Sequence, residues 1–115
     1  GMQTRDYTYI EDAVRAYDLV LNHNEPITEP INFGTGREES ILNLANTIID
    51  LCDKKSNIKP VHVEPRIVEV KRLIADATKA KKLLGWEPKY KFEDGLKEFI
   101  QWYKDYGFER RIKIE

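Results

Sequence analysis

The stretch that decides the fold is Gln3-Thr4-Arg5-Asp6-Tyr7-Thr8-Tyr9-Ile10-Glu11-Asp12. Its aromatic part, residues 5–9, has the composition of a β-strand. Beyond it, apolar residues recur at helical spacing, and Glu11 and Asp12 fall in the first turn, where the helix dipole favours negative charge. The pattern predicts an extended segment that leads into a helix over about residues 11–23.

Apolar stripes and capping residues predict three more helices further along the chain. Ser40 is a good N-cap for the first of them, and Asp76 can cap the second, which ends at Gly85. The predicted helices span about residues 41–54, 77–84 and 92–105. Short apolar runs predict strands at residues 31–33, 61–63 and 73–75.

Helices that alternate with short strands indicate the α/β class, here with about four helices and a few short strands. The length suits a single domain over residues 1–115. A three-residue strand at 31–33 is not stable alone, so we expect it to pair with a distant segment or with another chain. The tail at residues 107–115 is mixed in charge, and we expect it to be loosely ordered.

Composition argues against several kinds of partner. Lys and Arg number 19 and Asp and Glu number 20, a balance unlike that of a protein that coats nucleic acid or a membrane surface. No apolar run approaches the roughly 20 residues that span a bilayer. Cys52 is the only cysteine, and His23 and His62 are far apart with no further ligand at metal-binding spacing. We expect a cytoplasmic protein without a metal site and without a nucleic-acid or membrane partner.

A glycine-rich turn, Gly34-Thr35-Gly36, follows one predicted strand and precedes a predicted helix, as a dinucleotide-binding loop does. The third glycine of that fingerprint is replaced by Glu39, whose carboxylate would repel a pyrophosphate. The pattern therefore favours a tight turn that leads into a capped helix over a cofactor loop.

Three arginines, Arg5, Arg66 and Arg72, stand in or beside irregular segments and not on helix faces. A guanidinium group can hold phosphate through two parallel hydrogen bonds, so each arginine is a candidate phosphate ligand. Most arginines in loops are merely solvated, and position alone does not choose between the two interpretations.

Four segments in series resemble the extended short-chain dehydrogenase/reductases, the nucleotide-sugar epimerases and dehydratases. Residues 3–12 resemble the Gln-x-Arg-Asp-Phe-x-Tyr-Val-x-Asp segment of this family, and residues 31–36 resemble its Asn-x-Gly-x-Gly strand. Residues 66–70 resemble its Arg-Pro-Gly-Glu/Asp segment, and residues 75–88 its Ala-Asp-x-x-Lys-Ala…Leu-Gly-Trp-x-Pro run. The resemblance covers nearly the whole chain and is to the small C-terminal, substrate-binding domain of the family, without the Rossmann half.

The resemblance implies a binding site. It implies that Arg5 and Arg66 grip the diphosphate of a UDP-, dTDP- or GDP-sugar and that Glu69 contacts the ribose. In the family, NAD(P) and the catalytic Tyr-x-x-x-Lys belong to the Rossmann half, and no tyrosine of this sequence is followed four residues later by lysine. We therefore expect no catalytic residue and no bound cofactor in this chain.

Two functions remain open at this point. The chain could be the nucleotide-sugar-binding portion of a split or truncated epimerase or dehydratase, active only with a Rossmann-domain chain in trans. It could instead be a non-catalytic module that keeps the fold and serves in binding or assembly. In both cases the missing sheet would leave apolar surface uncovered, so we expect a homo-oligomer or a rearranged pairing that covers it.

Overall fold

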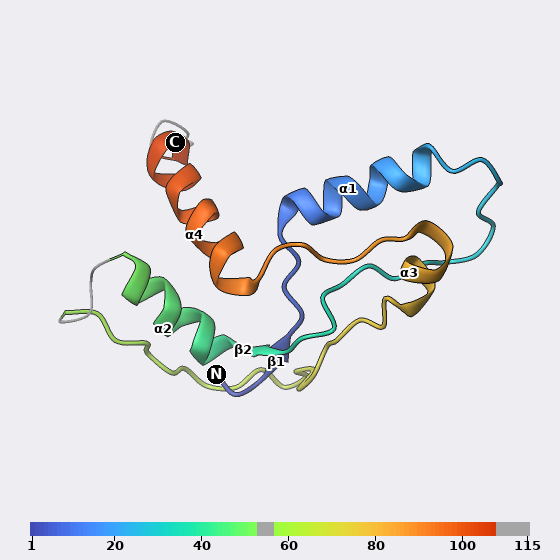
Figure 1. Ribbon diagram of the computed structural model, residues 1–115. Helices are drawn as coiled ribbons and strands as arrows, with labels where there is room; N and C mark the ends of the chain where they lie inside the picture. The colour runs from blue at the N-terminus through green and yellow to red at the C-terminus, as the bar shows by residue number, and fades with distance from the viewer. Residues whose placement is uncertain (53–56, 108–115) are drawn as a thin grey trace, which may run out of the picture.

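The structure, a computed structural model, describes residues 1–52 and 57–107. Four helices and one two-stranded sheet follow one another along the chain (Figure 1), in agreement with the predicted α/β class. The elements are β1 (Thr4–Arg5), α1 (Ile10–Leu21), β2 (Glu39–Ser40), α2 (Ile41–Leu51), α3 (Thr78–Leu84), α4 (Phe92–Trp102) and a terminal π-helical turn, η1 (Tyr103–Gly107). No helix among these described residues is long and apolar enough to cross a membrane.

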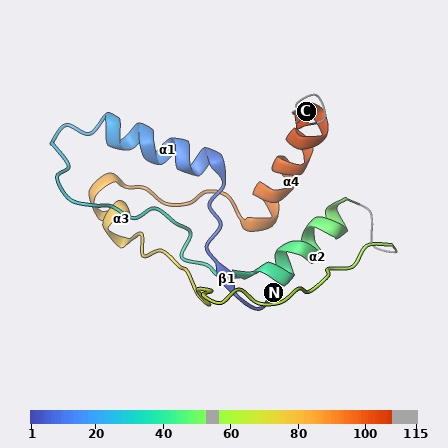
Figure 2. The same ribbon diagram turned by 180° about the vertical axis from the view of Figure 1, so that it is seen from behind.

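Two groups of helices lie on either side of the small sheet. In Figures 1 and 2 the strands β1 and β2 lie near the centre, with α2 and α4 on one side and α1 and α3 on the other. Long irregular segments connect the two sides, and the molecule measures 53 × 35 × 32 Å along its principal axes. The fold is therefore held together largely by contacts between helices and loops.

The core beside α1 is small and centres on Trp86. This side chain is fully buried with Ala16 and Ala80, and the ring of Phe33 meets it edge to face at 5.2 Å between ring centroids. The indole Nε1 donates a hydrogen bond of 3.0 Å to the backbone carbonyl of Asp12. Trp86 thus fills the core and also satisfies its polar nitrogen inside it.

Asp12 is the only charged side chain that is buried among the described residues. Its carboxylate accepts hydrogen bonds of 3.0–3.1 Å from the backbone N–H groups of Lys89 and Tyr90 and pairs with the guanidinium of Arg15. Burial opposes the charge, but these hydrogen bonds and Arg15 outweigh it and hold the pKa of Asp12 below its usual range. One carboxylate thereby fastens α1 to the segment that follows Trp86.

Two helix ends agree with the predicted caps. The Ser40 hydroxyl accepts a 3.0 Å hydrogen bond from the backbone N–H of Asn43, and Gly85 adopts the left-handed conformation with φ of 64°. The predicted cap Asp76 is one position off, because the N-cap of α3 is Ala77 and the helix begins one residue later than predicted; the Asp76 carboxylate still accepts a 2.9 Å hydrogen bond from the backbone N–H of Thr78. The last two residues of the predicted 41–54 helix, and all of the predicted loose tail but Gly107, lie outside the described residues.

The strand predictions were wrong in detail. Residues 31–33, 61–63 and 73–75 are irregular, and only Arg5 of the 5–9 stretch is in a strand. β1 instead pairs antiparallel with β2, and Thr4 forms a parallel bridge with Arg72. At 31–33 the apolar side chains serve the core, since Ile31 and Phe33 pack against the Trp86 cluster while their backbone joins no ladder among the described residues.

The Asp12 contacts predict a stability effect. Replacing the side chain as Asp12→Asn should lower the free energy of unfolding by about 1–3 kcal/mol, since one buried N–H donor loses its acceptor. Urea unfolding, monitored by tryptophan fluorescence, measures this change in the free energy of unfolding. Asp18→Asn is the matched control, an exposed carboxylate on the same helix, expected to change stability by less than about 0.5 kcal/mol. Equal effects of the two substitutions would contradict the anchoring role of Asp12.

Candidate functional site

A pocket of about 650 Å³ brings together all three residues that the sequence resemblance singles out, Arg5, Arg66 and Glu69. It lies between the start of the chain, the first turn of α2 and the extended segment 60–66. Arg66 and Glu69 are exposed, and Arg5 is half-buried. Residues 61 or more positions apart in the sequence thus line one surface.

Arg5 is held in place by backbone oxygens. Its Nη1 donates to the carbonyl of Thr4 at 2.7 Å and to the carbonyl of Val70 at 2.9 Å. Both bonds use one terminal nitrogen, so the guanidinium is oriented before any ligand arrives. Arg5 also ties β1 to the segment that carries Glu69, the predicted ribose ligand.

The third candidate arginine, Arg72, has a structural partner. Its Nε and one terminal nitrogen donate to the two carboxylate oxygens of Glu38, and the hydroxyl of Thr4 donates to the same carboxylate at 2.6 Å. The hydrogen bonds from Arg72 and then Thr4 lower the pKa of Glu38 to about 2. Arg72 is outside the pocket lining and fastens the segment after Glu69 to β1.

The glycine-rich turn is occupied by a carboxylate of the chain itself. Asp6 accepts 2.9 Å hydrogen bonds from the backbone N–H groups of Thr35 and Gly36, and a longer one of 3.2 Å from Ala75. Burial opposes ionisation, but the hydrogen bonds, led by those from Thr35, hold the pKa of Asp6 below its usual range. A Cβ on Gly34 would collide with Ala75, which explains the glycine there by close packing.

The turn therefore does not fit the pyrophosphate of a dinucleotide. A phosphate loop offers its backbone N–H groups to the ligand, whereas the N–H groups of Thr35 and Gly36 already have an anionic acceptor. The predicted interpretation as a tight turn agrees with this geometry. Among the described residues no cluster of three potential metal ligands occurs.

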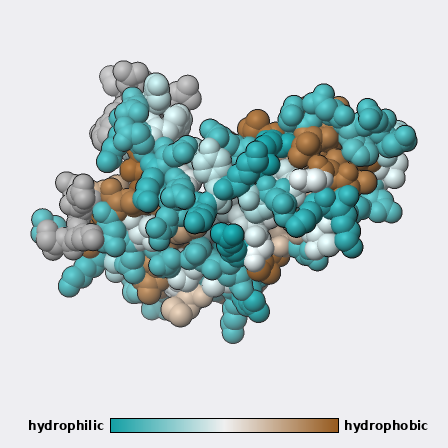
Figure 3. All heavy atoms as spheres, viewed as in Figure 1, coloured by the Kyte–Doolittle hydropathy of each residue, from teal (hydrophilic) through white to brown (hydrophobic). Residues whose placement is uncertain are grey.

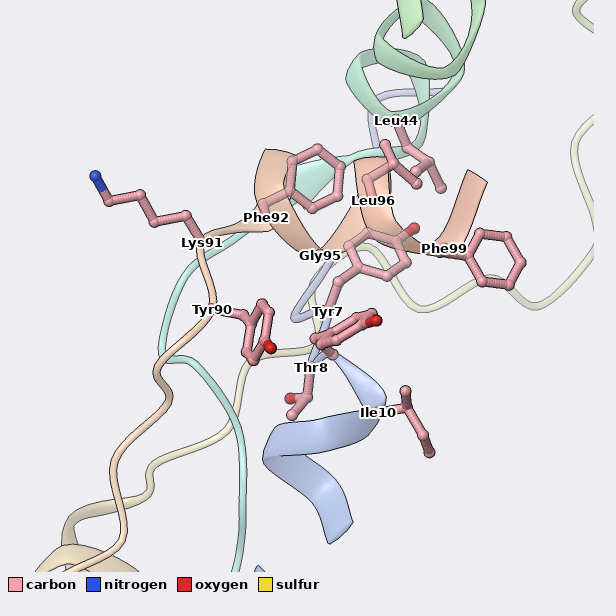
Figure 4. A pocket seen from close by; sticks show the side chains of 11 residues that line it. Tyr7, Thr8, Ile10, Leu44, Tyr90, Lys91, Phe92, Gly95, Leu96 and Phe99 are labelled. Carbon is pink, nitrogen blue, oxygen red and sulfur yellow. The ribbon is translucent and has the colours of Figure 1, made fainter. Parts of the chain in front are cut away.

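A second pocket, of about 290 Å³, is aromatic. Figure 4 shows it between the start of α1, the first turns of α4 and Leu44 of α2, with Lys91 pointing away from it. The rings of Tyr9 and Tyr90 lie 4.4 Å apart between centroids. A hydrogen bond from Tyr90 to Glu11 raises the pKa of that tyrosine to about 12. With no cation directed into it, this pocket does not suit a diphosphate.

Comparison with known proteins supplies the family. The family model described as GDP-mannose 4,6 dehydratase matches residues 1–99. The chain belongs to that family. It is a portion of an extended short-chain dehydrogenase/reductase, the group that the four sequence segments resemble.

Relatives of this family match nearly all of the chain. A trifunctional UDP-glucose 4,6-dehydratase/UDP-4-keto-6-deoxy-D-glucose 3,5-epimerase/UDP-4-keto-L-rhamnose-reductase of Arabidopsis thaliana is 37% identical over 90% of this chain and 15% of its own length. The UDP-glucose 4-epimerase of Thermotoga maritima, solved with UDP-glucose, superimposes with a TM-score of 0.82 at 36% identity, over 91% of this chain and 33% of that one.

A third relative shows the same partial coverage. The dTDP-glucose 4,6-dehydratase of Bacillus anthracis, solved in complex with NAD, gives a TM-score of 0.78 at 34% identity, over 94% of this chain and 33% of that one. The chain thus spans about a third of these two solved enzymes and 15% of the plant relative. It corresponds to the C-terminal portion of the epimerase and dehydratase structures, as the sequence predicts.

Sequence reasoning missed the roles of four polar residues, two of which line the pocket. Asp6 and Asp12 hold loops, and Gln3 and His62 line the pocket with the predicted ligands. Gln3 directly precedes β1 and lies two residues from Arg5, and this alternation along an extended chain is a signal that could have found it. Nothing in the local sequence indicates that His62 lines one pocket with Arg5.

Three of the carboxylates whose pKa is lowered, Asp6, Asp12 and Glu38, predict acid sensitivity. Asp6, Asp12 and Glu38 bind protons less readily in the folded chain than at their ordinary values of 3.8 to 4.5. Their contribution is present above those values and is lost as pH falls through the lower folded ones, so stability should decline between about pH 4.5 and 2.

Urea unfolding at a series of pH values measures this decline. Asp6→Asn should be less stable than the parent chain at pH 7 and should lose less stability on acidification, because one of the three proton-linked groups is gone. A free energy of unfolding that rises on acidification from pH 6 to 3 would contradict the prediction.

Proposed function

We propose that this chain binds the nucleoside diphosphate of a nucleotide sugar in the pocket of Arg5, Arg66 and Glu69, as the substrate-binding part of an NAD-dependent epimerase or dehydratase. The single observation that carries the proposal is the meeting of these three residues around one pocket. The family resemblance singles out each of them within its own motif, independently of where they lie in space.

The chemistry of the pocket suits such a ligand. Two guanidinium groups can neutralise a diphosphate through charge-assisted hydrogen bonds, and a carboxylate can accept from a ribose hydroxyl. The volume, about 650 Å³, falls within the range of small-molecule sites. Binding the nucleotide away from the reacting sugar would hold the sugar in register for hydride transfer.

The reaction itself needs groups that these residues do not supply. NAD(P) accepts and returns hydride when bound in the intact family, and a tyrosine acts as base. We place both in a Rossmann portion, either joined to this chain or present as a separate chain in trans. The turn formed by Gly34, Thr35 and Gly36 is left out of this chemistry, because Asp6 already occupies its N–H groups.

Binding by the isolated chain tests the proposal. Titration with UDP, UDP-glucose, dTDP-glucose and GDP-mannose should shift amide resonances at Arg5, Arg66 and Glu69. Arg5→Gln and Arg66→Gln should each weaken the binding of UDP about tenfold or more, because each removes charged hydrogen bonds to phosphate. Arg37→Gln is the matched control, an exposed arginine outside the pocket, and should leave Kd unchanged.

Two results would overturn the proposal. One is the absence of binding up to millimolar ligand, which would favour a module for assembly alone. The other is a Kd for UDP that is the same in Arg5→Gln, Arg66→Gln and the control Arg37→Gln. That result would place the ligand elsewhere.

We also propose that the chain forms a homo-oligomer through α1. Hydrophobic surface gathers over the α1 side of the molecule in Figure 3, and four apolar residues at helical spacing on α1 are 59–82% exposed. They are Ile10, Val14, Tyr17 and Leu21. A soluble chain that leaves such a stripe in water gains by pairing it with a second copy.

Light scattering at micromolar concentration checks the oligomer. The parent chain should have at least twice the mass of the monomer, and the Val14→Glu/Tyr17→Glu double variant should be monomeric, because the pair of charges disfavours burial of the stripe. Asp18→Glu, on the same helix, is the control and should leave the mass unchanged. A monomeric parent chain would contradict this proposal.

A further inference from the structure

Gln3 lies beside the proposed ribose ligand. Its side-chain Nε2 donates a 2.9 Å hydrogen bond to Oε1 of Glu69, and both residues line the pocket with Arg5. The bond satisfies one carboxylate oxygen and leaves Oε2 of Glu69 to accept from a ligand hydroxyl. An uncharged amide is a weaker partner for phosphate than a guanidinium, and the amide of Gln3 already donates to Glu69.

The backbone around Gln3 is fixed independently of its side chain. The carbonyl of Gln3 accepts a 3.1 Å hydrogen bond from the N–H of Ile41 at the start of α2. One residue later, Thr4 donates its N–H to the carbonyl of Lys71 at 2.8 Å. The amide of Gln3 therefore projects from a braced strand edge, whereas Glu69 belongs to an exposed irregular segment.

Two neighbouring residues of that segment are held by Arg5 of β1 and by Gln3, which directly precedes that strand. Gln3 binds the carboxylate of Glu69, and Arg5 binds the carbonyl of Val70 at 2.9 Å. Side chains two apart on an extended chain point to the same side, so both contacts face the pocket. The pair aligns the exposed segment against the strand that carries the predicted diphosphate ligand.

We infer that Gln3 is a positioning residue, which orients the Glu69 carboxylate for the ribose hydroxyls of a nucleoside diphosphate. The inference rests on the proposed function and deepens it. In the parent chain, the hydrogen bond from Gln3 restricts the rotamers of Glu69 before the ligand binds. Without the amide, Glu69 would lose that rotamer freedom only on binding, which weakens the affinity. The effect of Gln3 should therefore depend on the ribose and on Glu69.

Two ligands separate the contributions. UDP engages the ribose and diphosphate parts of the site, whereas inorganic pyrophosphate engages the arginines alone. Gln3→Leu, which keeps the bulk of the side chain and removes its donor, should weaken UDP binding about three- to tenfold and leave pyrophosphate binding unchanged. Unchanged pyrophosphate binding also shows that the variant is folded.

A double-variant cycle tests the route through Glu69. In the Glu69→Gln background the additional Gln3→Leu change should alter UDP binding less than about twofold, since the oriented carboxylate is already absent. Gln101→Leu is the matched control, because Gln101 of α4 donates a similar exposed hydrogen bond to Asp105 of η1. It should leave the binding of both ligands unchanged.

The outcomes distinguish this inference from the proposed function. Absence of UDP binding by the parent chain overturns both. UDP binding that Arg66→Gln weakens and Gln3→Leu leaves unchanged overturns the inference alone. Equal losses for UDP and pyrophosphate in Gln3→Leu, or a full loss that persists in the Glu69→Gln background, assign Gln3 a general structural role and also overturn it.

Discussion

The carboxylate of Asp12 is buried at the start of α1 and accepts the backbone N–H groups of Lys89 and Tyr90. Without that acceptor, the segment after Trp86 would leave two polar groups unsatisfied near the core. The same residue's carbonyl accepts from the indole of Trp86. One residue therefore joins the first helix, the core tryptophan and the approach to the last helix, across 74 or more positions of sequence.

Two other carboxylates also connect distant segments. Asp6 accepts hydrogen bonds from the turn at Thr35 and from Ala75, and Glu38 accepts them from Thr4 and Arg72. The sheet formed by residues 1–52 and 57–107 has two residues in each strand, so regular ladders supply few of the long-range hydrogen bonds there. Carboxylates that accept several bonds each take over that role. The pocket depends on them, because the Glu38 clamp brings the segment after Glu69 to the strand that carries Arg5.

The sequence was sufficient for the features that depend on local chemistry. The Ser40 cap, the left-handed Gly85 and the four helices follow from rules that involve a few neighbouring residues. The strands could not be predicted in this way, because a strand forms only with a pairing partner, and the local sequence pattern does not identify that partner. Ile31 and Phe33 have a strand-like composition, yet they serve as packing surface for Trp86.

In the candidate site and around it, the sequence likewise identifies some residues and misses others. Arg5, Arg66 and Glu69 could be named because the resemblance carries each residue within its own motif, and the pocket then placed them together. Asp12 was interpreted only as a first-turn acid, since its partners at Lys89 and Tyr90 are distant in sequence.

The position of the pocket separates the candidate site from the buried core. Its candidate binding residues stand on β1 and on the exposed 60–70 segment, whereas the buried core lies beside α1 and α3. Binding there can be changed without removing a core side chain, because Arg66 and Glu69 are exposed and bury little apolar surface. The proposed site thus belongs to loops fastened by carboxylates, and the core behind them is the frame on which those loops are held.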